Sequence, residues 1–211
     1  MPYTRGSSAN IIVGAAALFI ADSTLTPGTL GAFDANESYK DTLTDTLNAD
    51  YTNIGYTMNG LELQFQPDFG EVQVDQILDV AKLYKQGMKV NLATAFAEAT
   101  LENLLVSLAY SSDKLSGTKS SSNGQALDLS AGNIGECPVE RGLVAVGPGT
   151  GDCAAGNSIE RIYVAYRALS IENVTVSAKR DAPSMFEVSF RLLPANNGSY
   201  GKIVDRLVAS S

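Results

Sequence analysis

Histidine is absent from the 211-residue sequence. Without an imidazole, the chain has no Ser-His or Cys-His nucleophile pair and no histidine metal ligand. This excludes the common hydrolase and zinc-enzyme classes and leaves only lysine- or carboxylate-based catalysis. Asp75 and Asp79 are the candidate acid and base for such an enzyme, although acids on exposed strands are usually only solvated. We therefore expect a protein that is not an enzyme and that uses no cofactor.

Cysteine is scarce, and its two copies, Cys137 and Cys153, lie in one glycine-rich loop. A disulfide between them would close a ring of about fifteen intervening residues, which stabilises a fold by roughly 3 kcal/mol in the loop-entropy description. Two free thiols agree with the sequence equally well. Since two cysteines without histidine supply only half of a zinc ligand set, we expect no metal site.

Basic residues are scarce in the first part of the chain. Residues 1–81 contain eleven acids but only Arg5 and Lys40, a net charge of −9, whereas residues 82–211 contain thirteen bases and twelve acids. Proteins that bind nucleic acid do so largely by neutralising phosphates with Lys and Arg. The charge balance therefore argues against a nucleic-acid-binding protein, and it is compatible with a surface that repels nucleic acid.

No apolar run is long enough to cross a bilayer as a helix. The segment Ile11–Ala21 is the strongest candidate, but a transmembrane helix needs about 20 residues. It is also preceded by only one basic residue, Arg5, and lacks the small-residue pattern that marks a signal-peptide cleavage site. We predict instead a buried or inter-subunit β-strand, and no membrane association.

The most patterned part of the chain runs from Leu61 to Tyr110. Apolar residues alternate with polar residues over 61–66 and again over 71–77, as in a sheet with one buried and one wet face. Pro67, Asp68 and Gly70 predict a four-residue hairpin turn between the two runs, and Asn59-Gly60 predicts a turn before them. The expected buried residues are Leu61, Leu63, Phe65, Val72, Val74 and Ile77, and the expected wet residues are Glu62, Gln64, Gln66, Glu71, Gln73 and Asp75.

A third alternating run, Met88–Ala99, predicts another strand, and a helix is expected directly after it. Leucines at 101, 104, 105 and 108 follow the spacing of one helix face, and Thr100 stands at the N-cap position. The sequence thus predicts a hairpin, a strand and a helix in succession.

The remaining alternating segments predict further strands. Together with those above and the one predicted helix, they indicate a mainly β fold, a β-sandwich or barrel with one packed α-helix. We expect a single domain, 1–211, with long loop insertions at about 22–50 and 111–157. The further predicted strands are Ala126–Leu129, Leu143–Val146, Ile159–Leu169, Glu172–Lys179, Met185–Leu193 and Tyr200–Val208.

Two loop segments invite functional interpretations. The acidic stretch 22–50 is unusually long for a loop in a compact domain, so it is either an arm that contacts a neighbour or a solvated loop. The motif GPGTGD at 147–152 has the glycines of a phosphate-binding loop but lacks the Lys-Ser/Thr ending and a following helix pattern. An outer loop is the better interpretation of the second segment.

The residues 58–110 resemble the tail tube (major tail) proteins of long-tailed bacteriophages. The resemblance rests on a strand opened by Gly60, the pair Asp75-Gln76, the step Ala97-Glu98 and the leucine-rich segment 100–108. IERIYVAYRAL and MFEVSFRLL, within 159–193, resemble the family's closing strands more weakly. Residues 22–50 and 111–157 match no shared core of the family.

The resemblance implies a virion protein, made in the host cytoplasm, whose hexameric rings stack into a tail tube for DNA ejection. Its implied partners are other copies of itself, within and between rings, together with the tape measure, tail terminator and distal tail proteins. DNA would pass through without specific binding, because repeated lysine–phosphate contacts would arrest it. The expected lumen-facing residues are Glu62, Gln64, Gln66, Glu71, Gln73 and Asp75.

Three alternatives remain open at this point. The same polar residues would also suit an ordinary solvated face or an inter-ring contact. The inner tube of a contractile tail or of a type VI secretion-like system has a closely related architecture. A bacterial surface β-sandwich that acts as a binding module is a third alternative.

Overall fold

The structure is a computed structural model that describes residues 12, 14–21, 51–77, 79–120, 124–132, 134–135, 137–150, 158–177, 180–181 and 183–208. The acidic stretch 22–50 and Cys153 lie outside these residues. The predictions made for that stretch and for a Cys137–Cys153 disulfide therefore stay predictions.

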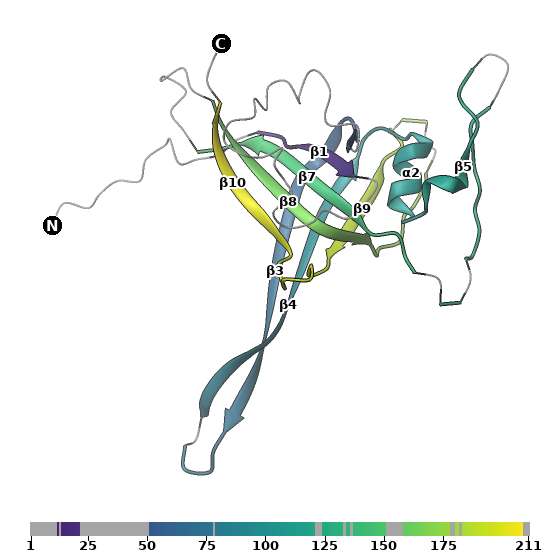
Figure 1. Ribbon diagram of the computed structural model, residues 1–211. Coiled ribbons are helices and arrows are strands. Elements are labelled where there is room, and N and C mark those ends of the chain that lie inside the picture. Colours follow the sequence, from purple (N-terminus) through teal and green to yellow (C-terminus); the bar gives the residue numbers. More distant parts are fainter. Residues whose placement is uncertain are drawn as a thin grey trace.

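One large antiparallel sheet dominates the described residues (Figure 1), in the order β2-β1-β7-β8-β9-β4-β3, with β10 paired to β8. The mainly β fold is thus confirmed. A small second sheet pairs β5 (Leu115–Ser116) with β6 (Ala126–Leu127), and a single turn of 3-10 helix, η3 (Ser112–Lys114), precedes it. The strands of the large sheet are β1 (Ala17–Ala21), β2 (Tyr51–Asn53), β3 (Thr57–Gln73), β4 (Val80–Phe96), β7 (Arg141–Pro148), β8 (Ser158–Ser170), β9 (Phe186–Leu192) and β10 (Gly201–Val208).

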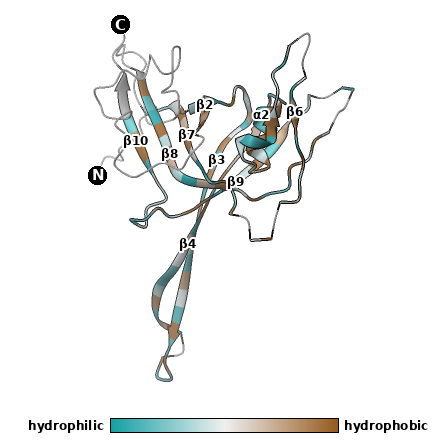
Figure 2. Ribbon diagram, turned by 45° about the vertical axis from the view of Figure 1, so that its right-hand side comes forward, coloured by the Kyte–Doolittle hydropathy of each residue, from teal (hydrophilic) through white to brown (hydrophobic). Residues whose placement is uncertain are grey.

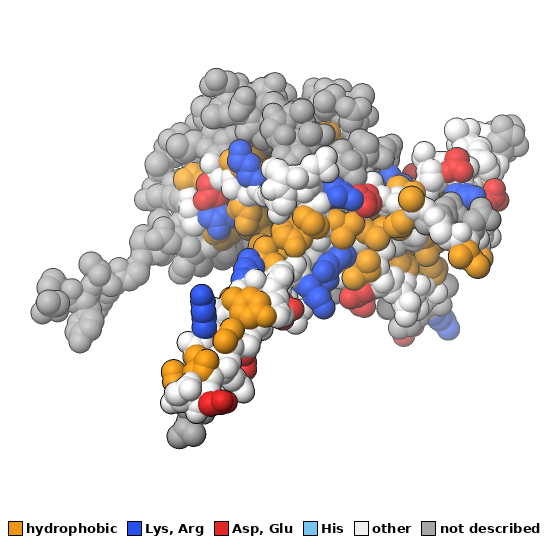
Figure 3. Space-filling view, turned by 60° about the horizontal axis from the view of Figure 1, so that its bottom comes forward, with side chains coloured by type: hydrophobic (Ala, Val, Ile, Leu, Met, Phe, Trp, Pro, Cys, Tyr) orange, Lys and Arg blue, Asp and Glu red, His pale blue; other side chains and the backbone are white. Residues whose placement is uncertain are grey.

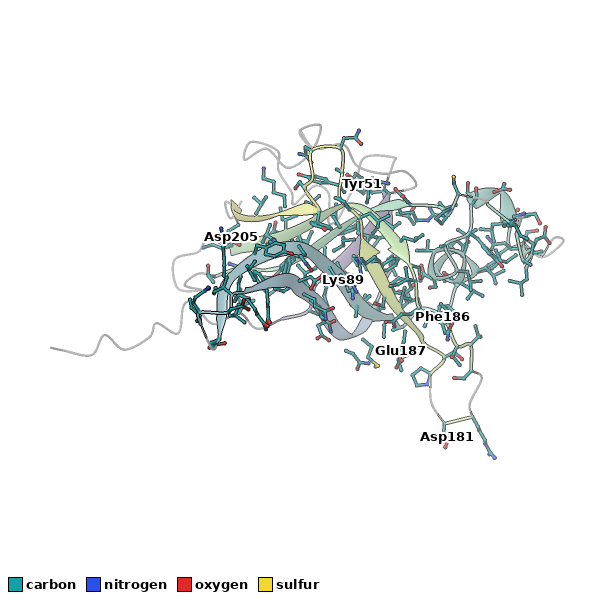
Figure 4. The ribbon with its side chains drawn as sticks, turned by 90° about the horizontal axis from the view of Figure 1, so that it is seen from below. Tyr51, Lys89, Asp181, Phe186, Glu187 and Asp205 are labelled. Atoms are coloured by element: carbon teal, nitrogen blue, oxygen red, sulfur yellow. The ribbon has the colours of Figure 1, made fainter. Side chains whose placement is uncertain are left out.

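The core lies on both faces of the central strands. Successive residues of β1 and β7 belong to two different apolar clusters, because alternate side chains point to opposite faces of a sheet. On β9, Phe186 is buried while its neighbour Glu187 is exposed (Figure 4). The larger cluster includes Leu18, Ile20, Val90, Leu92, Phe96, Leu143, Phe186, Val188, Phe190 and Leu192, and the smaller one includes Phe19, Val144, Val146, Ile162, Val164 and Tyr166.

The predicted helix is confirmed as α2 (Leu101–Ser107). The hydroxyl of Thr100 accepts a hydrogen bond from the Asn103 backbone N–H at 3.2 Å, which makes Thr100 the N-cap as expected. Leu105 is buried, and Leu104 and Val106 pack against the larger cluster. The helix therefore covers the core at the end of β4.

The sheet forks at β8. Along one edge, β8 pairs with β7, whereas its other edge pairs with β10 over 158–165 and with β9 over 168–170. Beyond its last pair with β9, at Val90, β4 continues away from the sheet, and of the described strands only β3 pairs with it there. The fork therefore separates β10 from the outer half of β4.

The β3–β4 hairpin is the most extended feature of the molecule. Each strand has 17 residues, but β4 pairs with β9 only over Val90–Phe96. Residues 66–89, which we call the arm, form a two-stranded projection from the body of the sheet (Figures 1 and 2). At about 3.3 Å per residue, its β3 part, 66–73, extends about 25 Å.

The predicted hairpin turn at Pro67–Gly70 is wrong. β3 runs through these residues and ends at Gln73, and the turn follows at Val74–Ile77 instead. Proline and glycine are tolerated here because β3 is an edge strand, where a missing N–H costs no ladder hydrogen bond. A register shift between Asp68 and Phe69, where Gln86 of β4 is an extra residue, accommodates the irregularity as a β-bulge.

Two further predictions from local sequence are also wrong. Asn59-Gly60, with φ of 66° and 73°, forms a bulge within β3 rather than a turn between strands. The predicted strand Glu172–Lys179 is not a strand over its described residues 172–177. Ser170 is the last residue of β8 that pairs with β9, and no strand pairing continues into the described residues 172–177. The other predicted strands are confirmed with shifted bounds, and β1 occupies only the end of Ile11–Ala21.

Candidate assembly surface

The arm exposes a series of large apolar side chains. Burial was predicted for Val72, Val74 and Ile77, but the structure contradicts it, as it does for Phe65, which is 55% exposed at the base of the arm. The physical reason is that no described element covers this part of the hairpin. The exposed apolar residues of the arm are Phe69 (54%), Val72 (40%), Val74 (39%), Ile77 (53%), Leu83 (59%) and Tyr84 (46%).

Side-chain packing around Gly70 holds the two arm strands together. The Tyr84 ring and the Gln86 side chain lie over Gly70, so that a Cβ there would come within 2.5 Å of both. Gln86 Nε2 donates to the Tyr84 hydroxyl at 3.1 Å. Gly70 is consequently buried although its neighbours are exposed. An aromatic ring laid over a strand glycine stabilises such a pair of strands, so the arm is organised before any partner is present.

The six predicted lumen-facing residues are all exposed, but they do not share one face. Glu62, Gln64 and Gln66 lie on the face opposite Leu61 and Leu63, and Gln64 Nε2 donates to Glu62 Oε1 at 2.9 Å. The bulge near Asp68 adds its residue to β4, so alternation along β3 is unbroken. Glu71 and Gln73 therefore lie on the other face, and Asp75 lies in the turn beyond β3.

A groove of about 610 Å³ lies at the fork between β10 and the base of the arm. Tyr200 bridges it, because its hydroxyl donates to the Met88 carbonyl at 2.8 Å. Among the described residues, β10 pairs only with β8, and residues 80–89 of β4 pair only with β3. Two unpaired strand edges thus border the groove. Its apolar lining includes Leu63, Phe65, Met88, Val90, Tyr163 and Ile203.

The groove and the end of the arm carry opposite charges. The described lining of the groove contains Lys85 and Lys202 and no acid. The end of the arm beyond the paired residues Gln73 and Val80 contains Asp75 and Asp79 and no base, whereas the rest of the arm contains both acids and lysines. Figure 3 shows hydrophobic side chains along the arm and on the body beside it, with basic side chains near the junction.

An ion pair fixes the edge of the body that borders the groove. Arg161 of β8 binds Asp205 of β10 through two hydrogen bonds, Nε to Oδ1 at 2.6 Å and Nη2 to Oδ2 at 2.7 Å. The guanidinium holds the pKa of the Asp205 carboxyl below its usual value. Since Asp205 and Arg161 are register partners, the pair joins the two strands directly.

The residues considered for chemistry lie apart from the groove. Asp75 and Asp79 are exposed in the turn of the arm, where Asp79 Oδ1 accepts from the Val80 N–H at 2.7 Å. Cys137 is exposed. Among the described residues, no group of three or more Cys, Asp or Glu side chains is placed to hold a metal ion, and no helix has the length and apolarity to span a bilayer.

Sequence reasoning missed the second arm strand and the groove. Residues 78–87 had no structural prediction, although Lys82 and Lys85 flank Leu83 and Tyr84 in a mixed polar and apolar run typical of an exposed strand. The groove joins residues of β3, β4, β8 and β10, and no local pattern connects these.

Compared with protein-family models and with characterised proteins, the chain matches none significantly.

Proposed function

We propose that this protein is a structural subunit that assembles with copies of itself into rings, which stack into a tube of the phage tail-tube kind. The observation that carries the proposal is the arm, a projecting hairpin with six large apolar side chains between 39% and 59% exposed. The resemblance of residues 58–110 to tail tube proteins supports the choice of a tube over other assemblies.

Such an arm is energetically unfavourable in an isolated subunit, because its apolar side chains are exposed to water. A two-stranded hairpin is marginally stable in water, and a contiguous exposed apolar surface marks an interaction site. Burial against a partner recovers about 25 cal/mol for each Å² of apolar surface covered. An arm that is already ordered by Tyr84 over Gly70 therefore gains further stability when its exposed apolar side chains are buried in an assembly.

The tail-tube proposal assigns a role to the polar face of β3. Glu62, Gln64 and Gln66 share one exposed face, so they are the subset of the six predicted residues suited to line a conduit together. An acid- and amide-lined wall repels phosphate over a Debye length of about 10 Å at 0.1 M salt. Glu71 and Gln73, on the other face, would then contact neighbouring subunits. Tape measure, terminator and distal tail proteins are the further partners this proposal implies.

Electron microscopy of the purified full chain tests the proposal directly, and we expect rings or tubes several nanometres wide. The informative variant shortens the arm by replacing residues 69–86 with Asn-Gly, which joins the paired residues Asp68 and Gly87 by a two-residue turn. It should fold as a monomer and form no tubes. A wild-type chain that stays monomeric at every concentration would refute the proposal and favour a surface binding module.

A further inference from the structure

We infer that the end of the arm of one subunit docks into the groove of the next, so that each copy both donates an arm and receives one. This inference rests on the proposed function, since it names the partner surface for the arm. Its components are the apolar side chains around Val74 and Ile77 and the groove between β10 and the base of the arm.

The first argument is apolar complementarity. Val74 and Ile77, 39% and 53% exposed, lie where the arm ends. The groove offers a hollow of about 610 Å³ lined by Leu63, Met88 and Ile203 among others, which is ample room for several side chains. Ile203 is itself 52% exposed, so both surfaces would lose apolar exposure on contact.

The second argument is charge. The end of the arm beyond the Gln73–Val80 pair carries Asp75 and Asp79 without a base, and the groove carries Lys85 and Lys202 without an acid. Opposite potentials steer two surfaces together and set their register. Two arms would instead repel each other end to end, which disfavours an arm–arm contact.

The third argument is symmetry. Arm end and groove are different surfaces of one chain, so a contact between them is heterologous and leaves a free arm and a free groove at the two ends of any pair. Such contacts close into a ring or continue as a filament. Unpaired edges of β10 and of β4 beside the groove also offer backbone groups to an incoming strand.

Photo-crosslinking of the full chain tests the contact. With p-benzoylphenylalanine at position 77, mixed with an isotope-labelled wild-type chain, crosslinks between copies should map to residues 163–165 and 198–203. The matched control places the same group at Ile171, which is also 53% exposed but lies outside both surfaces, and it should not reach these residues. Crosslinks from position 77 that map elsewhere, or to another arm, would overturn the inference.

Charge reversal gives a second, independent measurement. Lys202→Glu and Asp75→Lys should each raise the concentration needed for assembly about two- to fivefold, since exposed ion pairs contribute modestly. The double variant should recover most of the loss. Arg180→Glu, at an exposed residue outside the groove, should have no effect. Two additive losses without recovery would contradict docking of these charges on each other.

The two proposals fail differently. If rings or tubes form but crosslinks from position 77 avoid the groove, the inference is wrong and the structural role stands. If the wild-type chain stays monomeric in light scattering at all concentrations, both are wrong.

Discussion

The body and the arm of this protein are made of the same kind of sequence but have opposite environments. Phe96, on β4 in the body, is fully buried, with its ring centroid 6.4 Å from that of Phe190. Phe69, on β3 in the arm, is 54% exposed. Both belong to alternating strands of one hairpin, so alternation determines which side chains share a face and not whether that face is covered. We infer that the buried side chains of the body stabilise the monomer, whereas the exposed side chains of the arm promote association.

The largest expected effect comes from the same substitution in the two regions. Phe96→Ala should lower the free energy of unfolding by about 3–5 kcal/mol, because it leaves a cavity in the core. Phe69→Ala should change it by less than about 1 kcal/mol, since little burial is lost. Urea denaturation of dilute, monomeric protein measures both values.

Tube assembly should depend on the arm more strongly than the stability of the monomer does. Phe69→Ala, although nearly neutral in the monomer, should reduce tube formation seen by light scattering. An equal loss in the free energy of unfolding for Phe69→Ala and Phe96→Ala would contradict this distinction between body and arm.

A medium effect is expected where the body joins the hairpin to the helix. The buried side-chain amide of Asn103 donates to the carbonyls of Ile54 and Glu98, both at 2.9 Å. Asn103→Ala should cost about 1–3 kcal/mol, because two carbonyls lose their donor away from water. Thermal unfolding measures the loss, and Asn173→Ala at an exposed position is the control. An unchanged unfolding midpoint would show that water replaces the amide.

Local sequence patterns predict some of these elements correctly and others not. The helix was predictable because Thr100 and the leucine spacing are local signals. β8 and β9 were predictable from the alternation of apolar residues in their sequences, whereas β7 is a short apolar run that is buried on both faces. The turn at Pro67–Gly70 was mispredicted because the same residues suit an edge strand with a bulge. The exposure of Val72 and Val74 was not predictable, because their alternation is the same whether the covering surface belongs to this chain or to another.

A smaller effect is expected at the helix N-cap. Thr100→Ala should destabilise the body by about 1 kcal/mol, because the Asn103 N–H loses its hydroxyl acceptor. Thr100→Ser should restore most of the loss, since serine caps equally well. Chemical denaturation resolves a difference of this size. Equal stability of the alanine and wild-type chains would mean that tertiary packing alone holds α2.

The smallest expected effect is a pH dependence at the edge of the body, where β10 borders the groove. Arg161 lowers the pKa of Asp205 in the folded state, so the folded chain binds this proton less readily than the unfolded chain does. The pair therefore stabilises the fold at pH values above the unfolded carboxyl's pKa of about 3.9. That contribution is lost as the pH falls through the lower, folded value. Solvent screens the pair, because the Asp205 side chain is 44% exposed.

Asp205→Asn should consequently lower the unfolding midpoint slightly at pH 7, and the difference from wild type should shrink as the pH falls below about 4. Asp181→Asn, at an exposed carboxylate on another part of the body, is the matched control and should show no such trend. The arm adds a sharper test, because the docking that we infer would require this edge of the groove to be in place. If assembly is lost on acidification and Asp205→Asn causes the same loss at pH 7, body and arm are coupled through β10. If assembly is unchanged in both cases, the ion pair affects only the stability of the body.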